Sequence, residues 1–485
     1  MLPIPRLFKS LTLCLSLILP VASQAQNDSD DRYNLPSLGD VGASVYSTQQ
    51  EHELGRLWLM AFRSQVETVD DPLLLDYTEN LLYRLASHSE LDDRRLELVI
   101  VENATINAFA VPGGVIGVHN GLLLHTENES QLAGVLGHEL AHLSQRHFTR
   151  SVQKARQAAI PTMAGLLAGI VLAATTGTDA GMAAVAAGQA ASMQTQLRFS
   201  REHEQEADRI GMKTLAAADL DPSGIPSMFE VMQRNARFSN HNIPEFLLTH
   251  PLNESRISDS TNRARQYPRQ VYTNSADFQL MKARVELHFA DNLEGHLKQL
   301  RSREHLRRDA DRYATVLTLA KLNRWSEAQQ GLKPLLASEP HRIAYVVLAS
   351  EIEAGMGEHK AAIARLRENL AIAPRNYPLT MALADVLHQV GRAADAEAVL
   401  STLVHERPND PYLWYQLAEI RGLAGDILGV HRARAEYFIL NGLLDSADRQ
   451  LQYAFPLASG QRIEQRRIKE RARDVQRLRA KLKQF

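Results

Sequence analysis

The chain has 485 residues, of which 45% are hydrophobic and 23% are charged, a composition typical of a folded protein large enough for two cores. Its 54 basic residues are balanced by 56 acidic residues, so no basic excess is present to neutralise phosphates, which argues against a nucleic-acid-binding protein. The single cysteine, Cys14, lies near the N-terminus, which argues against both thiol chemistry and a disulfide scaffold.

The N-terminus has the pattern of a secretory signal peptide. Arg6 and Lys9 precede a short apolar run, residues 11–21, and small residues follow up to Ala25. The run is shorter than the roughly 20 apolar residues that a transmembrane helix needs. We therefore expect residues 1–25 to be cleaved off after Ala25 and the mature protein to occupy the periplasm of a Gram-negative bacterium.

The first part of the mature chain predicts a helix followed by three strands. Residues 26–46 are polar and are expected to form a loose lead-in. Thr48 and Glu51 resemble a capping box, with apolar residues at helical spacing behind them. Residues 96–101 (LELVIV) predict one strand, and residues 107–119 predict two more strands separated by a turn.

The next predicted helix carries the strongest local signal of the chain, the sequence HELAH. The helix is expected to begin at Asn128, with Gln131 in its first turn. His138 and His142 are four residues apart and so project from one helical face, where two imidazoles can bind one zinc ion. Glu139 lies beside them, in position to take a proton from a metal-bound water whose pKa falls to about 7. The motif predicts a hydrolase with one Zn²⁺ per subunit.

His147 follows the motif, and His119 and His125 precede it, but all three are expected to lie outside the site. His147 is five residues beyond His142, about 140° further around a continuous helix, so it is not expected on the metal face. His119 and His125 are expected in turns or at the surface.

Residues 159–194 are low in charge and rich in alanine, glycine and methionine. Their first half is too short to span a membrane, and the polar, flexible sequence TTGTDAG interrupts it. Two interpretations remain. The segment is expected to be a buried helical hairpin, or else a mobile apolar flap that contacts substrate or the membrane surface.

A zinc hydrolase needs a third protein ligand and an open position, and the segment SREHEQEADRIG supplies several candidates. Glu204 and Asp208 share one helical face, as a ligand and a carboxylate that orients a histidine. Glu202 and Glu206 form a parallel pair, which by itself is typical of a solvated acidic face. Spacing alone does not separate the two pairs, and it does not exclude His203.

The C-terminal half repeats every 34 residues. The repeated positions are Ala328, Ala362 and Ala396; Leu332, Leu366 and Leu400; Pro340, Pro374 and Pro408; and Gly357, Gly391 and Gly425. This period, with small residues where helices cross and proline at the end of each unit, is the tetratricopeptide pattern of stacked helix pairs. We expect degenerate units to extend from about Ala276 to a basic helix over residues 462–483, which caps the array.

HELAH followed by SREHEQEADRIG resembles the M48 family of zinc metallopeptidases. The resemblance implies that His138, His142 and Glu204 are the metal ligands, that Glu139 is the catalytic base and that Asp208 supports the site. The expected architecture is an α+β zincin-type metallopeptidase domain, mostly helical with a small β-sheet, followed by an all-α tetratricopeptide solenoid. The expected bounds of these two domains are residues 26–270 and residues 271–485.

Two further segments resemble elements of the same family. NAFAVPGG resembles the edge strand beside the metal, which implies that an extended substrate backbone pairs with Asn107, Ala108, Phe109 and Ala110. The sequence THP, followed by Arg-Ile, implies that His250 lies near the metal. There it would stabilise the oxyanion, or occupy the open zinc position and hold the enzyme latent.

A signal peptide, an M48-like domain and a tetratricopeptide array together resemble the periplasmic members of the family. The resemblance implies an endopeptidase with chaperone-like activity that degrades misfolded or stalled outer-membrane proteins and promotes their β-barrel assembly. It also implies that the array binds the β-barrel assembly machinery, and residues 159–194 could add a peripheral membrane contact. The alternative is an assembly chaperone or scaffold with a latent or structural zinc site, but Glu139 counts against it because a structural site needs no base.

Overall fold

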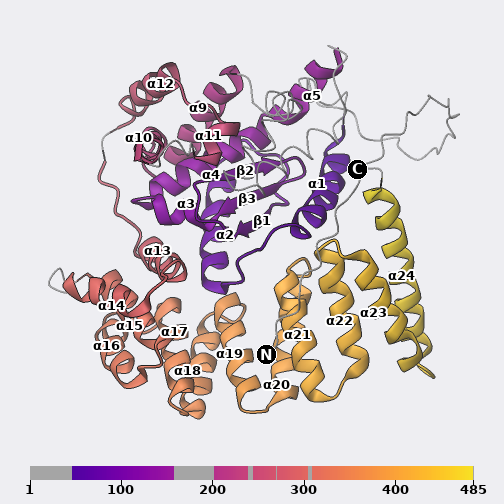
Figure 1. The fold of residues 1–485 in the computed structure, drawn as a ribbon. Helices are drawn as coiled ribbons and strands as arrows, with labels where there is room; N and C mark the ends of the chain where they lie inside the picture. Colours follow the sequence, from indigo (N-terminus) through magenta and orange to yellow (C-terminus); the bar gives the residue numbers. More distant parts are fainter. Residues whose placement is uncertain (1–45, 158–200, 239–243, 269, 304–307, 484–485) are drawn as a thin grey trace, which may run out of the picture.

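The computed structural model of the protein shows two regions, an N-terminal region around a small sheet and an arc of helices below it (Figure 1). We call them the N-terminal region and the helical array. The predicted signal peptide and the apolar segment 159–194 lie outside the described residues and stay predictions. The structure describes residues 46–157, 201–238, 244–268, 270–303 and 308–483.

The sheet of the N-terminal region has three strands in the order β1-β3-β2. β1 (Glu97–Val101) runs parallel to β3 (Val115–His119), and β2 (Ala108–Val111) runs antiparallel to β3. β2 therefore forms one edge of the sheet. The three predicted strands are confirmed, although β2 begins at Ala108 rather than at Asn107.

Helices cover the sheet on both faces. Among the described residues, no helix has the length and hydrophobicity needed to cross a bilayer. The helices of this region are α1 (Thr48–Arg63), α2 (Pro72–Ser87), α3 (Asn120–His125), α4 (Glu129–Ser144), α5 (His147–Gln157), α9 (Arg201–Ala217), α10 (Gly224–Phe238), α11 (Glu245–Thr249) and α12 (Glu254–Ala264).

The two faces of the sheet pack against different helices because successive side chains of a strand point to opposite sides. Leu98 and Ile100 of β1 belong to a core shared with α2, α3 and α4. Val99 and Val101 belong to a second core, around Trp58 of α1. α4, the helix that carries HELAH, packs against the edge strand β2.

The two predicted helix starts have different outcomes. α4 begins as expected, because the side chain of Asn128 accepts a hydrogen bond from the backbone three residues on. The capping box of α1 is formed by Ser47 and Gln50, so the predicted pairing of Thr48 with Glu51 is wrong by one residue. Glu51 is instead buried, where its carboxylate accepts hydrogen bonds from side chains near the start of α5.

The helical array confirms the predicted tetratricopeptide solenoid, from α13 to the basic helix α24. From α14 onward, each helix packs against the next helix along the chain. Its helices are α13 (Ala276–His288), α14 (Leu293–Ser302), α15 (Asp309–Lys321), α16 (Trp325–Ser338), α17 (Ile343–Gly355), α18 (His359–Ile372), α19 (Tyr377–Gln389), α20 (Ala393–Glu406), α21 (Pro411–Ala424), α22 (Ile427–Leu440), α23 (Leu444–Leu457) and α24 (Arg462–Leu482).

The glycine that recurs every 34 residues is explained by its backbone conformation. Gly357, Gly391 and Gly425 adopt φ angles of 80°, 72° and 77° in the turn between the two helices of a pair, a conformation that side chains disfavour. Asn323 occupies the same place one period earlier and has a φ angle of 57°. Asparagine is one of the few other residues that adopt this conformation, so the turn persists in a unit whose sequence lacks the glycine.

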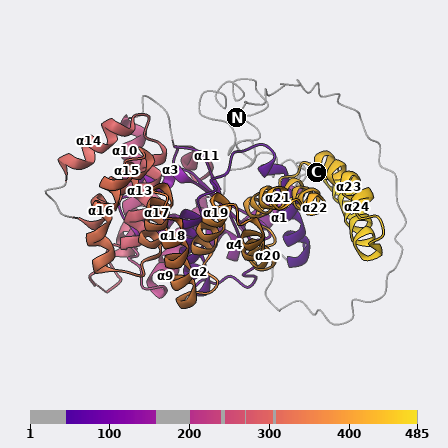
Figure 2. The ribbon, with the colours of Figure 1, turned by 90° about the horizontal axis from the view of Figure 1, so that it is seen from below.

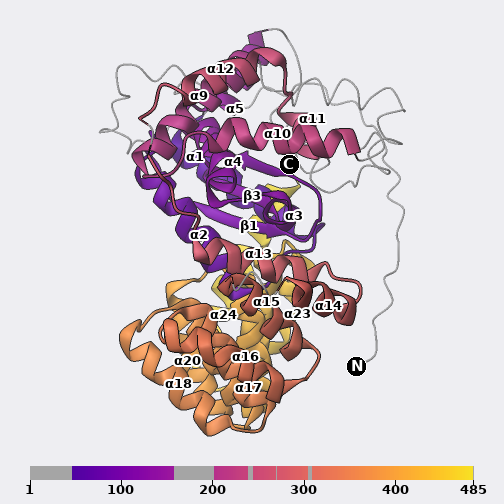
Figure 3. The ribbon, with the colours of Figure 1, turned by 90° about the vertical axis from the view of Figure 1, so that its left-hand side faces the viewer.

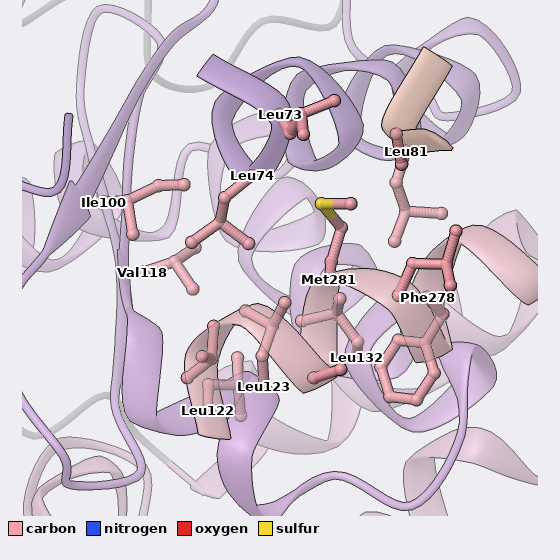
Figure 4. Close-up of a cluster of buried hydrophobic side chains, with 14 of the residues drawn as sticks. Leu73, Leu74, Leu81, Ile100, Val118, Leu122, Leu123, Leu132, Phe278 and Met281 are labelled. Carbon is pink, nitrogen blue, oxygen red and sulfur yellow. The ribbon is translucent and has the colours of Figure 1, made fainter. Parts of the chain in front are cut away.

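The two regions share one hydrophobic core. Phe278 and Met281 of α13 belong to the same buried cluster as Leu73 and Leu81 of α2 and Leu132 of α4 (Figure 4). The cluster continues into α15, α16 and α17, and α13 lies between the sheet and the array (Figure 3). The boundary between residues 270 and 271 stays a prediction, and the buried core does not divide there.

The far end of the array also contacts the N-terminal region, through α1 (Figure 2). Met60 packs in a cluster with Ile439 and Leu444. Lys481 of α24 lies 3.0 Å from the carboxylate of Glu53. The array therefore contacts the N-terminal region at both of its ends.

Candidate metal centre

The candidate residues meet where α4 and α9 pack closely together. Gly137 of α4 faces Gly211 of α9, and a β-carbon at Gly211 would lie 3.2 Å from the backbone nitrogen of His138. A side chain at this position would push the helices apart, so glycine permits their close approach. The acidic segment of α9 therefore lies against the HELAH motif, although its Asp208 is 70 residues away along the chain from His138.

Four side chains direct one ligand atom each to a common point. These atoms, from His138, His142, Glu204 and His250, all lie within 4.8 Å of one another, and all four side chains are buried. The Nε2 atom of His138 lies 3.0 Å from Nε2 of His142 and 3.3 Å from Nδ1 of His250. Three imidazole nitrogens and one carboxylate oxygen match the nitrogen and oxygen ligands of a tetrahedral zinc site.

In the absence of a metal, His142 and Glu204 already have the protonation states that bind a cation, whereas His138 must release a proton first. Burial lowers the pKa of His138, but hydrogen bonds to Asp208 and Glu204 raise it to about 9. Burial and the charge of His138 hold the pKa of His142 well below its usual value. Burial raises the pKa of Glu204, yet the charge of His250 and a hydrogen bond from His138 hold it well below its usual range. A carboxylate and a neutral imidazole are the forms that bind metal.

Glu139 lies between the ligand group and the edge strand β2. Its Oε1 atom is 3.6 Å from Nε2 of His250, and its side chain is only 1% exposed. Burial raises the pKa of Glu139, while the charges of His250 and His138 and the backbone amide of Ala110 oppose this shift. A buried carboxylate with a raised pKa beside a metal position is suited to accept and return a proton.

Asp208 and Arg256 support the ligands from behind. Asp208 lies 2.9 Å from Nδ1 of His138, which leaves the Nε2 atom of that ring for a metal. Arg256 donates to both carboxylate oxygens of Asp208 at 2.8 Å and lies 2.8 Å from Glu204. From the sequence, Arg256 was identifiable only as part of an element that resembles the family. It lies 48 positions beyond Asp208, so no local spacing indicates that the two side chains bind each other.

The structure distinguishes the two acidic pairs between which the sequence spacing could not decide. Glu204 and Asp208 face α4, as the family resemblance implied. Glu202 is exposed, and Glu206 lies on a different face, where it accepts hydrogen bonds from side chains of α5. The packing of α9 on α4 therefore selects one of the two parallel pairs.

His147 is not among the four converging residues, as expected, but the reason expected for this does not hold, and the expectation about His119 is wrong. α4 ends at Ser144 and Arg146 has a φ angle of 49°, so the chain turns back and the angle of a continuous helix does not apply to His147. The Nδ1 atom of His147 instead lies 2.9 Å from Nδ1 of His142. His119 is not at the surface but fully buried at the end of β3, and this burial lowers its pKa to about 3.

The predicted substrate strand lies at the sheet edge, but most of its side chains are engaged in the interior. Phe109 packs edge-on against Trp58 with ring centroids 5.6 Å apart, and Ala108 is fully buried. The side-chain amide of Asn107 donates to the buried carboxylate of Glu245. Among the described residues, β2 pairs only with β3, so its other backbone edge takes part in no strand pairing.

Comparisons with known proteins agree with this geometry. The model of peptidase family M48 matches residues 74–264, and a tetratricopeptide repeat model matches residues 354–420. The chain is 33% identical over 484 residues to the β-barrel assembly-enhancing protease of Escherichia coli (strain K12), which covers 99% of each chain. It is 32% identical over 486 residues to the protein of the same name from Yersinia pestis, which covers 98% of this chain and 99% of the relative.

A third relative matches a shorter part of the chain. The mitochondrial metalloendopeptidase OMA1 of Arabidopsis thaliana is 30% identical over 171 residues, which is 35% of this chain and 32% of that protein. The segment matched by the M48 model contains the four converging side chains and Glu139. The protein is a metalloendopeptidase that belongs to the M48 peptidase family, with a tetratricopeptide array joined to its peptidase region.

Proposed function

We propose that the protein is a periplasmic, zinc-dependent endopeptidase with chaperone-like activity. It degrades misfolded or stalled outer-membrane proteins and promotes the assembly of β-barrel outer-membrane proteins. The observation that carries this proposal is the convergence of His138, His142 and Glu204 beside Glu139. This group lies in a chain similar over its whole length to proteins named for β-barrel assembly.

The described residues fit one zinc ion per subunit. His138, His142 and Glu204 would hold the ion, and Asp208 orients the ring of His138. When bound, zinc would polarise the scissile carbonyl and make the attacking water more acidic. Glu139 takes the proton from that water and returns it to the departing amine, and its raised pKa suits both transfers.

We expect an extended segment of an unfolded substrate to add to the edge strand. Ala108, Phe109 and Ala110 lie in this edge strand and Asn107 directly precedes it, and β2 pairs only with β3 among the described residues. The amide of Ala110 lies close enough to Glu139 to lower its pKa, so a peptide paired along β2 would pass beside the base. Recognition through backbone hydrogen bonds does not depend on particular side chains, which suits an enzyme with varied unfolded substrates.

His250 is proposed to hold the site latent rather than to stabilise the oxyanion. Its Nδ1 atom lies 3.2 Å from Glu204 and 3.3 Å from His138, within the ligand group. Its ring stacks on Phe246 with centroids 4.5 Å apart. In this placement His250 would complete a closed set of four ligands around a bound zinc ion, so it would have to move before a substrate carbonyl could approach the metal.

The helical array is proposed to bind the β-barrel assembly machinery and client proteins. Stacked helix pairs create extended binding surfaces. A cavity of about 510 Å³ opens between α17, α19, α21 and the start of α2, and its lining includes Glu351, Asp385 and Tyr412. A partner bound there would contact both regions of the molecule. A peripheral membrane contact through residues 159–194 remains a further prediction.

The second candidate function is an assembly chaperone or scaffold with a latent or structural zinc site. The closed set of four ligands favours it, because structural zinc sites are closed whereas catalytic sites keep one position open. The buried carboxylate of Glu139 counts against it, because a structural site requires no base beside its ligands.

The decisive experiment measures zinc content and cleavage of an unfolded protein by the wild type, Glu139→Gln and His250→Ala. We expect stoichiometric zinc in the wild type and Glu139→Gln, complete loss of cleavage in Glu139→Gln, and faster cleavage in His250→Ala. Cleavage by zinc-loaded Glu139→Gln would contradict the assigned base. Zinc without cleavage in both the wild type and His250→Ala would favour the scaffold, and absence of zinc would overturn the metal site.

A further inference from the structure

His147 folds back onto the metal ligand His142. α4 ends at Ser144, and the positive φ angle of Arg146 reverses the chain before α5 begins. The side chain of Arg146 fixes this turn by donating to the carboxylate of Glu51 at 2.8 Å. As a result the Nδ1 atoms of His142 and His147 are 2.9 Å apart, and His147 is completely buried.

The ring of His147 makes further contacts through its second nitrogen and through one face. Its Nε2 atom lies 3.1 Å from a carboxylate oxygen of Glu206, which also accepts a hydrogen bond from Arg150 at 3.0 Å. The ring of His203 stacks on it with centroids 4.3 Å apart and an interplanar angle of 9°. These contacts fix both the position and the orientation of His147.

The chemistry of metal binding sets the direction of each hydrogen bond in the series that runs from His142 through His147 to Glu206. If His142 binds the metal through Nε2, its other nitrogen, Nδ1, must carry the hydrogen. That hydrogen needs an acceptor, and the atom facing it is Nδ1 of His147. His147 then carries its own hydrogen on Nε2, where the carboxylate of Glu206 accepts it.

We infer that His147 is a positioning residue that orients the metal ligand His142, with Glu206 as its outer support. The inference rests on the metal site of the proposed function. It gives the two histidine ligands different supports, a neutral imidazole for His142 and the carboxylate of Asp208 for His138. Loss of such a support commonly weakens metal affinity by about 10–100-fold.

The test compares two substitutions at the same position in the full chain. His147→Asn places an amide oxygen near the position of the lost Nδ1 atom, so it still accepts the hydrogen of His142. His147→Leu fills a similar volume but accepts no hydrogen bond. Zinc affinity is measured by competition with a chromogenic chelator, and the visible spectrum of the cobalt-substituted protein reports the geometry of the ligands. His405→Leu, which removes an exposed histidine of α20, is the control.

We expect His147→Leu to bind zinc about 10–100-fold more weakly than the wild type and to shift the cobalt spectrum. His147→Asn and the His405→Leu control are expected to stay within about threefold of the wild type, since each leaves an acceptor beside His142. Wild-type affinity in His147→Leu would overturn the inference. Equal losses in His147→Leu and His147→Asn would also overturn it, because they would indicate packing rather than hydrogen bonding.

Glu206→Ala keeps the test decisive if His147→Leu does not fold. The side chain of Glu206 is 35% exposed, so its removal leaves no buried gap, and we expect an affinity loss of about threefold to tenfold. Unchanged affinity in Glu206→Ala would overturn the inference. A wild-type protein that binds no zinc would overturn the proposed function as well, so the two failures are distinguishable.

Discussion

The metal centre and the helical array are stabilised in opposite ways. Around the centre, Glu139, Glu204, Asp208 and Arg256 are each only 1% exposed and lie against one another or the histidine ligands. In the array, the periodic buried positions are alanine and leucine, and ion pairs such as that of Arg324 lie nearer the surface. A buried charge that loses its partner costs several kcal/mol, whereas repeat units depend mainly on their neighbours. Substitutions should therefore have large effects at the centre and smaller, local effects in the array.

The largest effect is expected for Arg256→Met, which leaves the carboxylates of Asp208 and Glu204 buried without their cation. We expect the free energy of unfolding of the metal-free protein to fall by about 3–5 kcal/mol, measured by urea denaturation. Arg263→Met is the control, because Arg263 lies on the same helix but its pair with Asp259 is exposed, and its loss should cost less than about 1 kcal/mol. Similar losses in the two variants would contradict the difference between buried and exposed pairs.

The buried carboxylate of Glu245 should make the N-terminal region sensitive to pH. Burial raises its pKa to about 7, although hydrogen bonds from Asn107 and Thr105 oppose the shift. The unfolded chain loses this proton near pH 4.5, so between pH 4.5 and 7 the folded state binds more protons. The contribution of Glu245 to the free energy of unfolding therefore falls as the pH rises through this window.

Glu245→Gln isolates this contribution. Between pH 5 and pH 8 the wild type should lose about 2–3 kcal/mol more free energy of unfolding than the variant. Urea denaturation at the two pH values measures the difference, and the other titrating groups cancel because both proteins contain them. The same pH dependence in the two proteins would refute the prediction.

In the array, a packing change should have a moderate and local effect. Ala362→Leu adds volume at a fully buried position where two helices cross, and we expect a loss of about 1–3 kcal/mol in the free energy of unfolding. The neighbouring Ala361→Leu lies at the surface and serves as the control. Zinc content should be unchanged in both variants. A loss of zinc in Ala362→Leu would show that the array and the centre are coupled more tightly than expected.

The smallest effect is expected at the turns of the array. Gly391→Ala forces a side chain into a positive φ angle without any clash, because no atom lies within 4 Å of the added carbon, so it should cost about 1 kcal/mol. Asn323→Gly should stabilise the earlier turn by about a few tenths of a kcal/mol, because glycine adopts a positive φ angle more readily than asparagine does. Thermal unfolding measures both. Equal melting temperatures for Gly391→Ala and the wild type would remove the backbone explanation of the period.

The sequence predicted well those features that depend on nearby residues. The face shared by His138 and His142 follows from the helical repeat, and the start of α4 follows from the Asn128 cap. Predictions from the sequence failed where the chain reverses direction, or where a second pair of residues satisfied the same local pattern. The contact of His147 with His142 was missed because the helix ends before His147, and the capping box shifted by one residue to Ser47 because both registers fit.

The sequence by itself determined that two histidines share one helical face and that the C-terminal half repeats every 34 residues, because both follow from the covalent geometry of a helix and its turns. Only the tertiary structure decided that Glu204, rather than Glu202 or Glu206, faces the histidines, since that depends on which side of α9 packs against α4. It also decided that Arg256 bridges two carboxylates and that α13 completes the core of the N-terminal region. Such contacts join elements far apart in the chain, and no local spacing encodes which buried faces meet.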